Sequence, residues 1–141
     1  MRTMTDDEVW AFLASGPTTG ILATTTKLGR PHAVPIWFVV DGREIVFTTW
    51  HEAAKTHHIR RDSRVAFCVD DQTPPFSFVS IEGDCTLSDD LDELRRWATA
   101  IGGRAMGADQ AEAFGVRNAV TGELLGRIHP TKVISRAEMA A

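Results

Sequence analysis

The sequence predicts a mainly β protein in which about six antiparallel strands form a closed or partly closed barrel with flanking helices. Short runs rich in β-branched and aromatic residues, separated by turn signals, fill most of residues 18–87. The strongest turn signal, Asp41-Gly42, joins two of these runs as a hairpin. Only one short helical stretch interrupts them, which favours a barrel of consecutive strands. An open α+β sheet is the alternative, because periodicity does not reveal barrel closure.

The expected elements follow from local signals along the chain. Thr5 and Glu8 have the spacing of a capping box, and an apolar stripe follows until Ser15-Gly16-Pro17 ends the first helix. Gly83 marks a possible bulge in the fifth strand. The six predicted strands cover residues 18–27, 32–40, 44–50, 64–69, 76–87 and 123–135. Residues 70–75 form a polar, proline-rich loop.

Two further helical regions are predicted. Residues 53–62 have a helical and basic composition, but they lack a good N-cap residue. Residues 88–120 form a helical region that we expect to break at Gly102-Gly103. Apolar residues recur there at three- and four-residue spacing and predict one buried face, formed by Leu91, Leu94, Trp97 and Ile101.

Bulk properties exclude several classes of protein. A chain of 141 residues is long enough for one domain with a real core, and we assign residues 1–141 to one domain. A formal net charge of −4 argues against general nucleic-acid binding. No apolar run has the length of a membrane span, and the acidic N-terminus is unlike a signal peptide, so we expect a cytoplasmic protein. Cys68 and Cys85 are expected to be small core residues and not a disulfide.

The most informative segment is the basic helix that follows the third strand. Free N–H groups and the helix dipole favour an anion at a helix start, and nearby cations make a phosphate a credible ligand. The alternative is that this segment is only the solvated face of a surface helix. By helical spacing Ile59 packs inward. The candidate residues at this helix are Lys55, Thr56, Arg60 and Arg61.

The sequence offers little side-chain acid–base chemistry, and the catalytic residues are unknown at this stage. His51-Glu52 begins like a zinc-protease motif, but Lys55 stands where the second histidine would be, so we expect no metal site. The chain also lacks a nucleophile elbow, a GxGxxG segment, a P-loop and any tyrosine. A bound cofactor that carries the chemistry would explain this scarcity. Trp37 and Trp50 either line a flat ring or belong to the core or a dimer interface.

Several segments together resemble one known family. The run Lys27–Phe38, the strand end Thr48-Thr49, and Lys55 followed by Ile59–Val65 are similar to the pyridoxamine 5'-phosphate oxidase-like (FMN-binding split barrel) proteins. Within that superfamily they most resemble the deazaflavin branch, the oxidoreductases that use coenzyme F420. Residues 79–87 and 128–133 fit the same pattern, so the resemblance covers nearly the whole chain.

The resemblance implies a split β-barrel and a homodimer with two cofactor sites at the subunit interface. It also implies a role for each matching residue. The predicted strand at residues 32–40 borders the cofactor ring, a strand end contacts the ring and linker, and the basic helix holds the phosphate. Carried over by position, these cofactor-binding residues are Val34, Pro35, Ile36 and Trp37 for the ring, Thr48 and Thr49 for the linker, and Lys55, Thr56 and Arg60 for the phosphate and basic groove. The sequence departs from relatives at Ala53 and His58, and the loss of a polar side chain at Ala53 removes one phosphate contact.

The activity implied is hydride transfer from reduced coenzyme F420 to an electron-poor small molecule, such as an enone, an unsaturated lactone or a tetrapyrrole. The main alternative is an FMN-dependent protein like pyridoxamine-phosphate oxidase, because one phosphate site and one ring slot serve both cofactors. A non-catalytic flavin- or haem-binding protein on the same barrel is a second alternative. A structural dimer with a vestigial pocket is a third.

Overall fold

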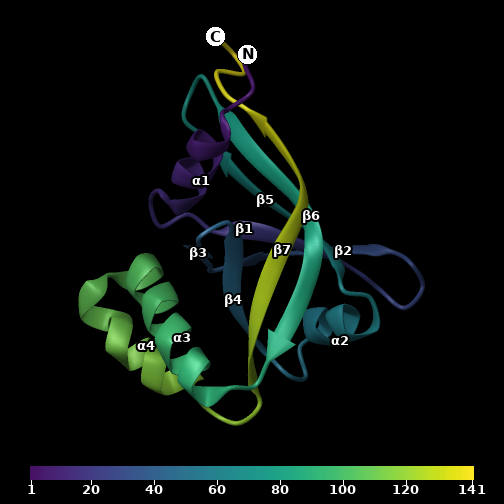
Figure 1. Ribbon diagram of the computed structural model, residues 1–141, viewed down its shortest axis with the longest axis vertical. Coiled ribbons are helices and arrows are strands. Elements are labelled where there is room, and N and C mark those ends of the chain that lie inside the picture. The colour runs from purple at the N-terminus through teal and green to yellow at the C-terminus, as the bar shows by residue number, and fades with distance from the viewer.

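The computed structural model describes residues 1–141 as one antiparallel sheet with four α-helices around it (Figure 1). The helices are α1 (Asp6–Ala14), α2 (Ala54–Arg61), α3 (Leu91–Met106) and α4 (Ala111–Asn118), with a short 3₁₀ helix at Ala108–Gln110. The strands are β1 (Gly20–Thr25), β2 (Pro31–Ile36), β3 (Val39–Asp41), β4 (Glu44–Trp50), β5 (Arg64–Asp71), β6 (Ser77–Ser88) and β7 (Glu123–Arg136). Hydrogen bonding orders the seven strands β2-β1-β5-β6-β7-β4-β3.

The chain connection between the two edge strands forces this sheet to curl. β2 and β3 lie at opposite edges, yet only Trp37 and Phe38 separate them in the chain. A flat sheet of seven strands would place its edges about 29 Å apart, whereas a link of this length spans about 11 Å at most. The sheet therefore wraps into a barrel that stays split between β2 and β3, which confirms the predicted barrel over the open sheet.

The single strand predicted at residues 32–40 is wrong. The strand is interrupted at Trp37-Phe38 and forms β2 and β3, so the barrel has seven strands and not six. The break turns Phe38 into the barrel, where its ring packs edge-on against Phe67 at 4.9 Å between centroids. Trp37 points outward instead and remains 40% exposed. The predicted hairpin at Asp41-Gly42 is confirmed, because β3 and β4 pair directly across this turn.

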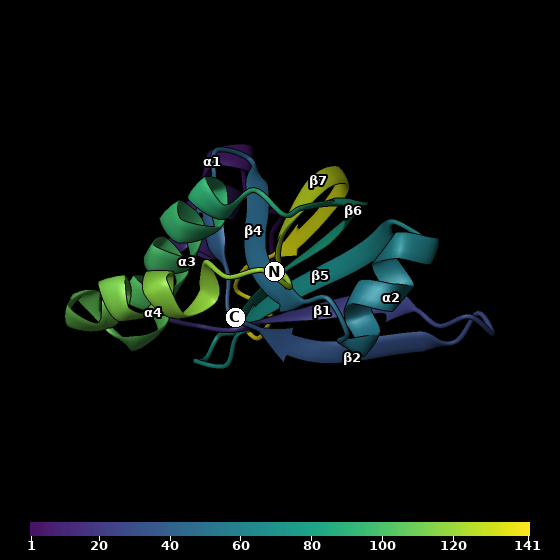
Figure 2. The same cartoon turned by 90° about the horizontal axis from the view of Figure 1, so that it is seen from below.

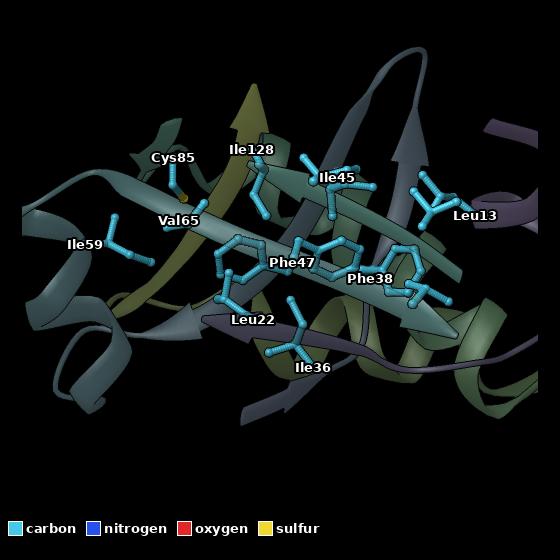
Figure 3. Close-up of a cluster of buried hydrophobic side chains, with 14 of the residues drawn as sticks. Leu13, Leu22, Ile36, Phe38, Ile45, Phe47, Ile59, Val65, Cys85 and Ile128 are labelled. Atoms are coloured by element: carbon cyan, nitrogen blue, oxygen red, sulfur yellow. The ribbon is translucent and has the colours of Figure 1, made fainter. Parts of the chain in front are cut away.

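Large apolar side chains fill the barrel interior (Figure 3). They come from alternate positions of the strands, as the period of two requires. Two glycines make room for the largest of them. A Cβ at Gly20 would lie 2.1 Å from the ring of Phe67, and one at Gly126 would lie 2.3 Å from the ring of Phe47. Cys85 joins this core, but Cys68 does not: it is half-buried on the outer face, which corrects the prediction for that residue.

Helices α3 and α4 form a layer against the outside of the barrel, on the opposite side from α2 (Figure 2). Leu94 and Ile101 of α3 pack with Val46 of β4 and Leu125 of β7 in a second, smaller core. The predicted helix break at Gly102-Gly103 is wrong, because α3 continues to Met106 and ends at the left-handed Gly107. The two glycines instead allow α4 to approach, since a Cβ at Gly102 would lie 2.4 Å from Phe114.

Local contacts fix both ends of the chain. The capping box at the start of α1 is confirmed, with the Glu8 N–H donating to Thr5 Oγ1 and the Thr5 N–H donating to the Glu8 carboxylate. Arg2 pairs with Ala137, so the two termini lie side by side (Figure 1). The predicted bulge is also present, as a register shift at Gly83. No helix combines the length and the apolar character that crossing a bilayer requires.

Gly126→Ala should destabilise the barrel by about 1–3 kcal/mol, because the added methyl overlaps the Phe47 ring in a close-packed core. Urea unfolding of the single variants and of the double variant with Phe47→Leu measures this. We expect the smaller side chain to relieve the clash, with a coupling energy of about 1 kcal/mol or more. Additive effects of the two substitutions would contradict the proposed steric conflict.

Candidate functional site

Helix α2 is attached to the end of β4 by buried hydroxyl groups. The side chain of Thr56 is fully buried, and its Oγ1 donates to the carbonyl oxygen of Trp50 at 2.7 Å. Oγ1 of Thr56 also lies 2.8 Å from Oγ1 of Thr49, which is buried as well. Ile59, one turn further along the helix, packs into the barrel core as the spacing predicts. These contacts hold the first turn of α2 in one position relative to β4.

A second set of contacts attaches α2 to the other side of the barrel. His58 Nδ1 lies 2.9 Å from Oγ1 of Thr24 on β1, and the His58 ring contacts that of His32 on β2 at 5.0 Å. Burial lowers the pKa of His58, with the neighbouring His32 adding to the effect. The Arg61 guanidinium donates to the carbonyl oxygen of Thr25. Helix α2 thus bridges β1, β2 and β4 at one end of the barrel (Figure 2).

The N-terminus of α2 leaves backbone donors available. The residue at the N-cap position is Ala53, and no side chain caps the helix. The N–H groups of Thr56 and His57 donate to the Ala53 carbonyl oxygen, so those of Ala54 and Lys55 are the ones left for an external anion. Lys55 lies in this turn, half-buried and in no ion pair. Burial lowers the pKa of its ammonium group, although the carboxylate of Glu123 opposes this shift. The donor set therefore fits a phosphate group.

The carboxylate of Glu123, at the start of β7, acts on this cation through space, without an ion pair between them. Glu123 pairs with Trp50 across the β4–β7 ladder, at the point where the chain leaves β4 for α2. Its Oε2 atom is buried and has no hydrogen-bond partner. Burial raises the pKa of this carboxyl group, and Lys55 counteracts part of that rise. The site therefore contains one cation and one carboxylate that are both partly removed from water and do not satisfy each other.

A surface hollow of about 300 Å³ adjoins Glu123. It lies between the loop at Thr121-Gly122 and helix α2, and His51 and Arg60 contribute to its lining. Two larger hollows, of about 500 and 580 Å³, lie on either side of residues 70–72. None of the residues predicted to bind the cofactor lines those two, so the chemistry of the side chains, and not the volume of the hollow, identifies the α2 region.

The structure separates the predicted site residues into groups with different surroundings. Thr49 and Thr56 are buried and bonded to each other, which leaves only their backbone groups for a ligand. Thr48, next to Thr49 on the strand, points to the opposite face of the sheet. Lys55 is half-buried at the helix start, whereas Arg60 is exposed at the hollow.

The predicted ring-bordering residues lie along β2 and its exit. Val34 and Ile36 face the barrel interior, and Pro35 faces outward. Trp37 packs edge-on against Phe114 of α4 at 5.4 Å between ring centroids. In the hydrogen-bonded order of the strands, β2 forms one edge of the sheet, and β4 is next to the strand at the other edge. The start of β2 lies beneath α2, through the contact of His32 with His58, whereas Trp37 at its exit lies against α4, on the opposite side of the barrel from α2 and Lys55.

Sequence reasoning missed Glu123 and the contact between His32 and His58. Glu123 follows a glycine at the start of a strand, and nothing in its local spacing distinguishes it from a solvent-exposed carboxylate. Its position beside Lys55 depends on the pairing of β4 with β7, which are distant in the chain. The histidine contact depends in the same way on β2 lying beneath α2. In both cases the contact depends on how segments distant in the chain lie against each other, which a local sequence pattern does not contain.

The outer face of the sheet carries a mostly apolar row that crosses five strands and contains one serine. Pro35, Ile21, Cys68, Ser80 and Ile134 are successive register partners on β2, β1, β5, β6 and β7. Directly opposed residues of a sheet lie on the same face. Ile21 and Ile134 remain 42% and 37% exposed in the single chain. A second row beside it is formed by Ala33, Ala23 and Ala66.

Solved structures share this fold. A conserved hypothetical protein from Mycobacterium tuberculosis is 27% identical, with a TM-score of 0.85 over 97% of this chain and 87% of that one. An F420 reductase is 23% identical, with a TM-score of 0.69 over 86% and 93% of the two chains. An FAD-binding protein from Mesorhizobium loti is 20% identical, with a TM-score of 0.72 over 95% of both chains. No curated protein matched the sequence.

A family model provides the assignment that these structural likenesses alone do not. The model described as pyridoxamine 5'-phosphate oxidase matches residues 5–134, which include all seven strands up to the last residues of β7. The barrel, split between β2 and β3, agrees with this match. The chain belongs to the pyridoxamine 5'-phosphate oxidase family.

Proposed function

We propose that this protein is an oxidoreductase that transfers a hydride from reduced coenzyme F420 to an electron-poor small molecule such as an enone, an unsaturated lactone or a tetrapyrrole. The observation that carries the proposal is the uncapped start of α2 with its half-buried, unpaired Lys55, a donor set suited to a phosphate-bearing cofactor. Family membership supports redox chemistry with a flavin-type cofactor. The shared fold of an F420 reductase supports the deazaflavin in particular.

In this proposal the chain binds and orients the cofactor. Lys55 and the free N–H groups of the first turn of α2 would hold the phosphate, and Arg60 would extend the basic surface. Thr49 and Thr56 act indirectly, because their buried hydrogen bonds keep that turn in place. Val34, Pro35, Ile36 and Trp37 would border the ring, with Thr48 beside the linker. The bound deazaflavin would supply the hydride, and orientation in a water-poor site is the contribution of the protein.

We also propose that the protein acts as a homodimer with the cofactor sites at the subunit interface. The row from Pro35 to Ile134 lies on the outer, partly exposed face of the barrel, and exposed apolar surface of this kind often marks an interaction site. A two-fold dimer would place the same face of a second copy against it. Pro35 belongs both to this row and to the proposed border of the ring, so the partner would help to enclose the cofactor.

Titration of the purified protein with oxidised F420 and with FMN, followed by fluorescence, tests the cofactor. We expect the deazaflavin to bind at micromolar concentration or tighter, and FMN to bind more weakly. A preference for FMN would instead support an FMN-dependent oxidase-like protein. Turnover of reduced F420 with a panel of enones and lactones then separates an enzyme from a carrier protein, and binding of neither cofactor would contradict the proposal.

Lys55→Ala should weaken F420 binding by roughly 1.5–3 kcal/mol, the range for a hydrogen bond to a charged group. The dissociation constant would then rise about 10- to 150-fold. Lys27→Ala, which removes the same charge from the exposed turn between β1 and β2, is the matched control and should bind like the wild type. Unchanged affinity in Lys55→Ala would remove this residue from the phosphate site.

Ile134→Asp should convert the dimer to a monomer, because it places an unpaired carboxylate in the proposed interface at a cost of about 3–5 kcal/mol. Light scattering after size-exclusion chromatography measures the mass. Val116→Asp is the matched control, since Val116 is an exposed apolar residue on α4, away from the sheet face. A dimer of normal stability in Ile134→Asp would show that this face is not the interface.

A further inference from the structure

We propose that Glu123 makes the Lys55 site selective for the charge of the phosphate, favouring a singly charged phosphodiester over a doubly charged phosphomonoester. The inference rests on the proposed function, since it assumes that Lys55 meets the phosphate of the cofactor. F420 carries its phosphate as a diester with one negative charge on the phosphate group. FMN carries a monoester, which is close to doubly charged above its second pKa of about 6. The fixed carboxylate would therefore act as the selectivity residue.

The fold holds Glu123 in a fixed place beside the start of α2. It lies opposite Trp50, and the preceding Gly122 has a left-handed φ of 102°. A Cβ at Gly122 would lie 2.6 Å from the Trp50 ring, so only glycine lets the chain pass this close. The N–H of His51 donates to the Gly122 carbonyl oxygen at 2.8 Å. These contacts hold the backbone of Glu123 beside Trp50, at the strand end from which the chain enters α2.

The surroundings of Glu123 leave its charge incompletely compensated. Oε2 is buried without a hydrogen-bond partner, and Glu123 forms no ion pair. Three cationic or titratable groups act on it through space: Lys55 from α2, Arg117 from α4 and His51 from the intervening loop. None of these interactions cancels the cost of burial, which has the largest effect on the carboxyl group. An anion bound at Lys55 would therefore be close to an unsatisfied negative charge.

Coulomb repulsion converts this arrangement into selectivity. The repulsion between Glu123 and a bound phosphate scales with the charge of the phosphate, and the partly dry site strengthens it relative to water. The attraction between the phosphate and Lys55 also grows with the charge of the phosphate. The repulsion from Glu123 therefore offsets much of the binding free energy that a second negative charge on the phosphate would add. The backbone N–H groups of α2 still donate to a diester, because they are hydrogen-bond donors to either form.

The experiment measures the dissociation constants of FMN and of F420 at pH 8, where the monoester is doubly charged. Three proteins are compared: the wild type, Glu123→Gln and Glu52→Gln. Glu123→Gln keeps the shape of the side chain and removes its charge. Glu52→Gln removes one charge from an exposed residue of the neighbouring loop and is the matched control. Glu123→Asp, which keeps the charge, should keep the selectivity, and thermal unfolding confirms that every variant is folded.

We expect Glu123→Gln to lower the ratio of the FMN to the F420 dissociation constant roughly tenfold, mainly through tighter FMN binding. Glu52→Gln should leave this ratio within about twofold of the wild type, since exposed charges are screened. An unchanged ratio in Glu123→Gln, with Lys55→Ala still weakening both cofactors, would overturn this inference alone. Binding of neither cofactor by the wild type would overturn the proposed function, and the inference with it.

Discussion

The two-residue link between the edges of the sheet is the constraint on which the rest of this structure depends. Because Trp37 and Phe38 must join β2 to β3, the sheet has to curl until its first and last strands are neighbours. The curl encloses the apolar side chains of the barrel and sets its diameter. It also brings β1 and β2 near enough to β4 for one short helix to touch all three. The candidate site is therefore a product of closure, and no single strand could form it.

Helix α2 divides its polar groups between holding the fold and meeting a ligand. Thr56 and His58 use their side chains in hydrogen bonds to Trp50 and to Thr24 of β1, which attach the helix to the barrel. The start of the helix, by contrast, has no capping side chain, and Lys55 has no ion-pair partner. A helix end left incomplete costs stability in the isolated protein, and a bound anion would recover that cost. The arrangement links the stability of α2 to occupancy of the site.

Local signals predicted the elements well, and non-local pairing accounts for what they missed. The capping box at Thr5, the hairpin at Asp41-Gly42 and the bulge at Gly83 depend on short-range chemistry that spacing reveals. The break in the strand at Trp37 serves closure of the whole sheet, which no short window contains. The glycines of α3 were interpreted as a helix break, whereas they provide the space for α4. Lys55 was visible as part of a basic helix, but the carboxylate beside it was not.

The two ends of the chain lie side by side, so the same strand pairings could be made by a chain in which the strands follow one another in a different order. Arg2 and Ala137 are already bridged by backbone hydrogen bonds, and the hairpin turn around Leu28-Gly29 is exposed at the far tip of β1 and β2. A short peptide joining residues 1 and 141, with new ends opened in that turn, would preserve every strand pairing and the link between β2 and β3. The fold therefore fixes which strands are neighbours, and a chain permuted in this way should keep the same neighbours.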